Sequence, residues 1–125
     1  MRRFFRIDPE KRFLKGQKRK LLKTKKRLER ELRKITRTKQ GTYKTLYLDF
    51  GSKEDDNAQE VQIYEGFMSI EKGLENLLEK VNKALTKIEK GKYGICEKCG
   101  KKIDKKRLEA FPEAELCAKC ARGKG

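Results

Sequence analysis

Four cysteines near the end of the chain form two short pairs. They are Cys96 with Cys99 and Cys117 with Cys120, so two residues lie inside each pair and 17 lie between the pairs. Two intervening residues let one tight turn direct both thiolates at one ion, and this spacing is typical of a four-thiolate zinc site. The sequence therefore predicts one structural Zn(II) ion held by Cys96, Cys99, Cys117 and Cys120.

Other uses of these cysteines fit the sequence less well. Two disulfides would need an oxidising compartment, which no feature of the chain indicates. A thioredoxin-like redox pair needs one Cys-x-x-Cys at a helix start within a βαβ pattern, and the sequence lacks that pattern. Thiols that serve only as core residues would not come as two matched pairs.

The same residues argue against an enzyme. Four protein ligands leave no position on the metal for a water molecule, so the predicted zinc stabilises structure and performs no hydrolysis. The chain contains no histidine. Catalysis by a Ser-His or Cys-His pair is therefore excluded, and the sequence predicts a protein without catalytic activity.

The segment around the cysteines, residues 91–125, has too few apolar side chains to fold without the metal. A structural zinc contributes about 10–16 kcal/mol of apparent binding free energy to such a segment. Gly100 directly follows Cys99 and suits the left-handed backbone that these turns often need. Metal binding and folding of this segment are expected to occur together.

A long helix is predicted upstream, from Asp8-Pro9-Glu10 to about Lys39. Asp accepts bonds from the free amides of a first turn, Pro is tolerated at the first helical position, and Glu favours the positive end of the dipole. An apolar stripe recurs every seven residues at Leu14, Leu21, Leu28 and Ile35, with Leu22 and Leu32 beside it. Lys and Arg dominate the remaining surface, so this narrow stripe needs a partner.

A second helix, over residues 57–90, can supply that partner. Its apolar residues follow the three-four alternation of a coiled-coil seam, with Glu71 as the one polar interruption. The seam residues are Tyr64, Phe67, Leu74, Leu78, Val81, Leu85 and Ile88, and Ile63, Ile70 and Leu77 widen it. Similar helix lengths favour an antiparallel hairpin within one chain, and hence a monomer; the alternative is that each helix pairs with another copy in a homodimer.

The expected fold is thus mainly α: a long antiparallel helical (coiled-coil) hairpin followed by a small four-cysteine zinc finger. Residues 1–90 would form the basic hairpin, with an acidic tip loop near residues 51–60, and residues 91–125 would form the zinc-finger domain.

The connection between the helices carries acid in an otherwise basic chain. Residues 40–52 alternate polar and apolar side chains between glycines, which predicts a short extended segment. Glu54, Asp55 and Asp56 follow, and Asp55, Asp56 or Asn57 can cap the second helix. Capping accounts for one carboxylate, or two with the helix dipole, and leaves the third without a structural reason.

The net charge of +16 is unevenly distributed along the chain. Residues 1–50 hold 19 basic and 5 acidic side chains, whereas residues 51–90 hold 6 and 9. The basic half predicts an acidic partner, either nucleic acid or an acidic protein surface; the alternative is a solvated helix face without a partner. No apolar run approaches the length of a membrane span, so we expect a soluble, cytoplasmic protein.

Beyond the hairpin and its acidic turn, several short motifs recur in a known family. These are Gly91-Lys92-Tyr93-Gly94-Ile95-Cys96-Glu97-Lys98-Cys99-Gly100, Arg107-Leu108-Glu109-Ala110, Pro112, Leu116-Cys117 and Cys120. With them the chain resembles the DksA/TraR family of C4 zinc-finger proteins. The resemblance is close over residues 57–121 and rests on shape and charge over the first helix.

This resemblance implies a transcription factor that binds RNA polymerase directly and inserts its coiled coil into the secondary channel of the enzyme. The acidic tip, Glu54, Asp55, Asp56, Asn57 and Ala58, would then lie near the active site and its magnesium. The family's tip motif is Asp-x-x-Asp-x-Ala; Asp56-Asn57-Ala58 matches its second half, and Lys53 stands at the first Asp.

Two hypotheses follow from different classes of protein. The first is a DksA/TraR-type regulator that binds RNA polymerase, with nucleic acid as a further partner of the basic first helix. The second is a basic zinc-finger protein that binds RNA, DNA or the ribosome directly through residues 1–50. Neither involves a membrane.

Overall fold

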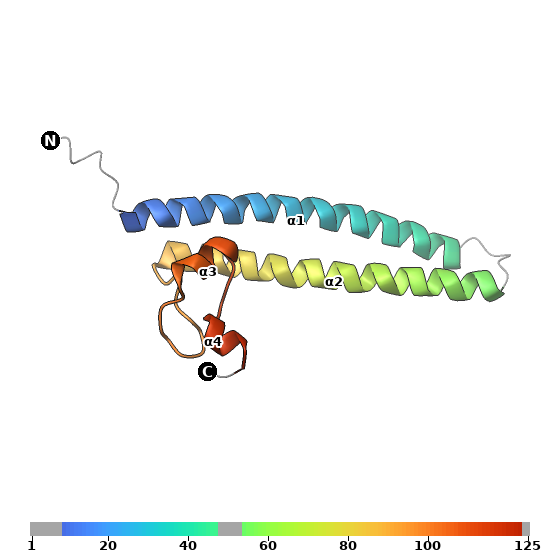
Figure 1. Ribbon diagram of the computed structural model, residues 1–125. Coiled ribbons are helices and arrows are strands. Elements are labelled where there is room, and N and C mark those ends of the chain that lie inside the picture. Colours follow the sequence, from blue (N-terminus) through green and yellow to red (C-terminus); the bar gives the residue numbers. More distant parts are fainter. Residues whose placement is uncertain (1–8, 48–53, 124–125) are drawn as a thin grey trace. The chain divides into compact units, whose positions relative to one another are not determined.

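The computed structural model describes residues 9–47 and 54–123, and the side chains of residues 43–47, 54–58 and 60 lie outside this description. The chain order is α1 (Pro9–Tyr47), α2 (Glu54–Lys90), α3 (Lys105–Ala110) and α4 (Ala118–Ala121) (Figure 1). Two compact units are present. We call Met1–Lys25 with Glu79–Gly125 the finger unit and Lys26–Leu78 the tip unit.

In each unit, taken by itself, a stretch of α1 lies alongside a stretch of α2 in the antiparallel direction (Figure 1). In the finger unit Leu21 and Val81 are completely buried and Ala84 is nearly so. In the tip unit Leu28 is buried, and Ile35, Leu74 and Leu78 are half-buried. The predicted helical hairpin, with a seam of heptad spacing, is therefore confirmed.

The polar interruption of the seam has partners on the facing helix. Glu71 accepts a hydrogen bond of 2.8 Å from the Thr36 hydroxyl and forms an ion pair with Lys39. The bond from Lys39, followed by that from Thr36, lowers the pKa of Glu71 below its ordinary value of 4.5. Pairing a half-buried carboxylate in this way offsets the loss of its hydration.

The predicted widening of the seam is found only at Leu77, which is half-buried. Ile63 and Ile70 are about half exposed, at 53% and 51%, and Leu22 is 42% exposed. One facing helix covers only a narrow stripe, so residues beside that stripe stay in contact with solvent.

The end of α1 differs from the prediction. The helix passes Lys39 and continues to Tyr47, so the extended segment expected over residues 40–52 is wrong as far as residue 47, and residues 48–52 lie outside the described residues. One glycine such as Gly41 costs a helix only about 1 kcal/mol relative to Ala, and a short alternating run does not distinguish strand from helix.

The start of α2 differs by a smaller amount. The helix begins at Glu54, so the backbone of Asp55, Asp56 and Asn57 lies within its first turn rather than at the cap position expected for one of them. Acidic residues are favoured both at a cap and in the first turn, and the sequence pattern does not separate these positions. No helix among the described residues is long and apolar enough to cross a membrane.

Candidate metal centre

The first cysteine pair lies on a tight turn between the two ends of an isolated β-bridge, Ile95 and Lys102. The Cys96 amide donates to the Lys101 carbonyl at 2.8 Å, and the Gly100 amide donates to the Cys96 carbonyl at 2.9 Å. Gly100 closes the turn with a φ of 74°, which confirms the left-handed position predicted from sequence. The Cys99 amide points at the Cys96 sulfur, 3.5 Å away.

The second pair repeats this arrangement at the start of a helix. Cys117 is the N-cap of α4, and its sulfur accepts from the Cys120 amide at 3.5 Å. In both pairs the amide of the later cysteine is thus directed at the sulfur of the earlier one. Such amide bonds stabilise a thiolate, which is the form that binds metal.

The two turns bring all four sulfurs together. The Sγ atoms of Cys96, Cys99, Cys117 and Cys120 lie within 4.8 Å of one another, and those of Cys99 and Cys117 are 3.9 Å apart. Cys96 and Cys120 are buried, whereas Cys99 is exposed. Four thiol sulfurs grouped at this distance are the donor set that tetrahedral Zn(II) prefers.

The environments of the two buried cysteines differ. The Cys99 amide, opposed by burial, lowers the pKa of Cys96 to about 6, whereas burial raises the pKa of Cys120 to about 12. A metal that binds all four sulfurs must displace the proton from Cys120, so its affinity falls in acid.

A small apolar core lies beside the sulfurs. It consists of the buried residues Cys96, Ile103, Leu108 and Cys120, with Phe13, Tyr93, Ala114, Leu116 and Cys117 packed against them. Gly94 has a φ of 83°, and a Cβ placed on it would lie 3.2 Å from Leu108 Cδ1. Both the backbone angle and this close approach favour glycine at that position.

A buried glutamine joins this core to α1. Gln17 is 2% exposed, and its Nε2 donates to the Leu108 carbonyl at 2.7 Å and to the Tyr93 hydroxyl at 2.9 Å. Tyr93 donates in turn to the Pro112 carbonyl at 2.8 Å, and burial raises the pKa of Tyr93. Lys105 of α3 also pairs with Glu10 and lies over the ring of Phe13.

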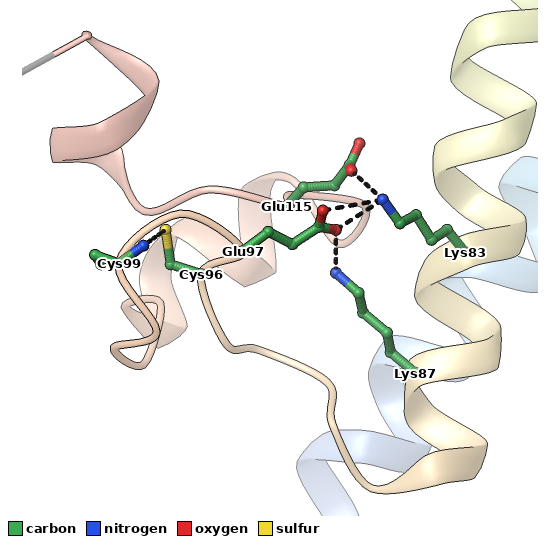
Figure 2. Close-up of polar contacts among 6 residues, drawn as sticks. All are labelled: Lys83, Lys87, Cys96, Glu97, Cys99 and Glu115. Carbon is green, nitrogen blue, oxygen red and sulfur yellow. Dashed lines mark hydrogen bonds and ion pairs between the residues drawn. The ribbon is translucent and has the colours of Figure 1, made fainter. Parts of the chain in front are cut away.

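A second set of contacts joins both cysteine turns to α2 (Figure 2). Lys83 Nζ lies 3.0 Å from Glu97 and 2.9 Å from Glu115, and Lys87 pairs with Glu97. Glu97 lies between Cys96 and Cys99, and Glu115 lies two residues before Cys117. Lys87 first and Lys83 second lower the pKa of Glu97 to about 2, so this network stays charged at neutral pH.

The sequence identified the four cysteines and missed these attachments. Gln17 carries a signal, because it is a polar residue at seam spacing between Leu14 and Leu21. Glu97 carries a weaker sequence signal, because it is the acidic residue between Cys96 and Cys99. Of the predicted tip residues, the backbone of residues 54–58 belongs to α2, and their side chains lie outside the described part.

Comparison with known proteins agrees with this geometry. Residues 91–124 match the family described as the prokaryotic dksA/traR C4-type zinc finger. A solved structure of transcription factor DksA2 from Pseudomonas aeruginosa is similar to this chain, with a TM-score of 0.69 and 23% identity over 94% of this chain and 85% of that one. No curated protein matches the chain. The family match and the clustered cysteines together indicate one structural zinc, and the likeness to DksA2 is one of fold.

Proposed function

We propose that this chain, which carries a C4 zinc finger of the DksA/TraR type, is a transcription regulator that binds RNA polymerase directly. The observation that carries the proposal is a combination: residues 91–124 match the zinc finger of this family, and the chain has a fold similar to that of DksA2. In this proposal the hairpin enters the secondary channel of the polymerase, and the protein works in the cytoplasm with its polymerase. The protein acts by binding and performs no catalysis.

The proposed zinc ligands are Cys96, Cys99, Cys117 and Cys120, whose sulfurs are the clustered donor set. In this proposal they close a finger domain within residues 91–125, which follows the hairpin of α1 and α2 within residues 1–90. The finger is fixed to the hairpin by Gln17 and by the carboxylates of Glu97 and Glu115. In this role the metal stabilises the finger unit, and residues 54–58 act on the polymerase.

The tip unit has the surface expected of a protein-binding segment. Four large apolar side chains of α2 are partly exposed there: Val61, Ile63, Met68 and Ile70. Exposed apolar side chains that a monomer leaves uncovered are suited to contact with a protein partner. We propose that Glu54, Asp55, Asp56, Asn57 and Ala58 lie beside the active site and that the carboxylates of Glu54, Asp55 and Asp56 alter its magnesium environment.

The binding test is a pull-down of core RNA polymerase by the full-length, zinc-loaded chain, with another secondary-channel protein as competitor. We expect binding at moderate salt and its loss when the competitor is added. Failure to bind core polymerase at moderate salt would contradict the proposal, and binding that ignores the competitor would contradict the location in the channel.

The activity test replaces Asp55 and Asp56 by Asn in an in vitro transcription assay. Asn caps a helix about as well as Asp, so the substitution removes charge with little change in stability. We expect polymerase binding close to wild type and loss of the effect on transcription. The matched control is Glu65→Gln with Glu75→Gln, which removes two carboxylates from exposed positions elsewhere on α2. Retained activity in the Asp55/Asp56 variant would show that the tip acid serves only as a helix start.

A further inference from the structure

The outer face of α1 within the tip unit carries a row of cations. Lys26, Arg30, Arg33 and Arg37 are spaced by four, three and four residues, so they lie on one side of the helix. Arg27 and Lys34 stand beside them, and all six side chains are exposed. We call these six residues the basic stripe. At 1.5 Å per residue it runs for about 16 Å along the helix.

Within the described residues, the basic stripe makes no ion pair with a carboxylate. Glu29 and Glu31 belong to the same helical stretch, but neither is in any of the five ion pairs of the described residues. Elsewhere the lysines do find acids: Lys39 pairs with Glu71, Lys83 with Glu97 and Lys105 with Glu10. Within the stripe itself, like charges three and four residues apart repel one another. An anionic partner would remove that repulsion.

The chemistry of the stripe identifies the class of partner. Four of its six side chains are arginines, whose planar guanidinium binds phosphate oxygens through two parallel hydrogen bonds. Protein interfaces have an apolar core, and no large apolar side chain between residues 26 and 37 is among the exposed ones. Proteins that bind single strands stack bases on aromatic rings, and residues 26–37 contain none. A regular row of cations without rings or apolar contacts fits the backbone of a duplex.

We propose that the basic stripe binds the sugar-phosphate backbone of duplex DNA without reading its sequence. The choice of DNA over duplex RNA rests on the proposed function, because a polymerase regulator works beside duplex DNA, and it requires that residues 26–37 stay outside the channel that the hairpin enters. Duplex DNA carries one negative charge per about 1.7 Å of axis, so several phosphates lie within the length of the stripe. Binding therefore releases counterions and weakens steeply as salt rises.

The test measures the affinity of the full-length, zinc-loaded chain for a fluorescent duplex DNA of arbitrary sequence over a series of salt concentrations. The variant changes Lys26, Arg30, Arg33 and Arg37 to Gln. We expect the slope of log K against log salt to become shallower by about 4, one for each phosphate that the variant no longer neutralises. The weakening should be the same for unrelated DNA sequences. Circular dichroism confirms that the variant keeps its helices.

A matched control removes the same charge elsewhere. Lys72, Lys80, Lys90 and Lys92 are exposed positions outside the stripe, and they are changed to Gln together. This control should keep a slope close to that of the wild type, since only the net charge differs. An equal weakening in both variants would show a general charge effect and would overturn the inference. A slope of log K against log salt near zero for the wild type would also overturn the inference.

Competing ligands decide the class of partner. Single-stranded DNA, duplex RNA of the same length and polyglutamate are titrated under identical conditions. Stronger binding of duplex DNA than of each of these, abolished in the stripe variant, supports the inference. Equal or stronger binding of duplex RNA, single-stranded DNA or polyglutamate overturns it.

The same variant separates this inference from the proposed function. Core polymerase without DNA should be bound equally by the wild type and the stripe variant. If the variant loses polymerase and keeps DNA, the stripe is a polymerase contact; the inference then fails and the proposed function stands. If the wild type binds DNA through the stripe but does not bind polymerase, the proposed function fails and the stripe remains a DNA surface.

Discussion

The two compact units of the molecule are built from the same two helices but are stabilised to different degrees. Among the described residues, eight buried side chains lie in the finger unit: Gln17, Leu21, Val81, Ala84, Cys96, Ile103, Leu108 and Cys120. In the described part of the tip unit, Leu28 is the one buried side chain. Four of the five ion pairs in the described part belong to the finger unit, and the Lys39–Glu71 pair belongs to the tip unit.

This difference indicates that the finger unit stabilises the hairpin, whereas the tip unit offers exposed surface to a partner. A heptad seam one residue wide is enough to pair two helices, but it leaves apolar flanks and basic faces in solvent. In the finger unit Phe13 and Gln17 of α1 are covered by the finger core and its hydrogen bonds, whereas Leu22 is 42% exposed. In the tip unit the apolar flanks remain open, as at Ile63 and Ile70. Binding segments are drawn from the less stable parts of proteins, so the tip unit is where a partner is expected.

The largest effect should come from removing a zinc ligand. Cys96→Ser is expected to abolish stable zinc binding and to unfold residues 91–125, because a structural zinc contributes about 10–16 kcal/mol of apparent binding free energy. The tip unit should keep its helices. Metal analysis with hydrogen exchange measures both changes. One zinc per chain with wild-type exchange in the Cys96→Ser protein would contradict the four-thiolate site, and Lys98→Ser in the same turn is the matched control.

A core truncation in each unit tests whether the units are separate. Leu21 is 0% and Leu28 is 2% exposed, so Leu21→Ala and Leu28→Ala remove the same atoms from equally buried sites in different units. Each should cost about 2–5 kcal/mol. We expect Leu28→Ala to speed amide exchange in residues 26–78 while the finger stays protected, and Leu21→Ala to do the reverse. Identical exchange patterns would show one cooperative unit.

Removing the buried amide should loosen the finger by a smaller amount. Gln17→Leu leaves the Leu108 carbonyl without its donor, at a cost of about 1–3 kcal/mol, and zinc should stay bound. Lys20→Met is the control, because Lys20 reaches the Glu109 carbonyl at 3.3 Å from an exposed position and should contribute little. Thermal unfolding followed by circular dichroism measures the difference in stability. Equal stability of Gln17→Leu and wild type would refute this role of Gln17.

The smallest effect should be the acid sensitivity of the tip unit. The pKa of Glu71 is lowered from its ordinary value of 4.5 by Lys39 and Thr36. Its contribution to stability is therefore fully present above pH 4.5 and is lost as the pH falls further through the lowered pKa. Glu71→Gln should remove this part of the acid dependence and lower the melting temperature by a few degrees at most at neutral pH. An unchanged acid dependence in Glu71→Gln would show that the carboxylate has no such role.

Features encoded by local spacing could be predicted from the sequence. The cysteine pairs place four sulfurs together because each pair needs only one turn, and the heptad of Leu21 and Leu28 places both on the seam. The end of α1 was predicted too early, because the alternation after Gly41 is too short to separate strand from helix. The pattern of residue types therefore predicts a helix and its buried face more securely than the residue at which the helix ends.

The attachments of the finger could not be predicted, because they join residues that are far apart in the sequence. Nothing in the types of Lys83 and Glu115 distinguishes them from other charged residues until the fold brings them to 2.9 Å. Gln17 is visible as a polar residue in an apolar stripe, but its partner is a backbone carbonyl, which carries no sequence signal.

The Gln17 hydrogen bond has a consequence for synthesis of the chain. Gln17 and Leu108 are 91 residues apart, whereas Thr36 and Glu71 are separated by 35. A ribosome adds about 5–20 residues per second, so Gln17 waits on the order of 5 to 20 s between its own synthesis and that of its partner. During that interval Phe13 and Gln17 lack the finger core that packs against them. Mutual repulsion among the Lys and Arg side chains of α1 opposes association of nascent chains during this interval.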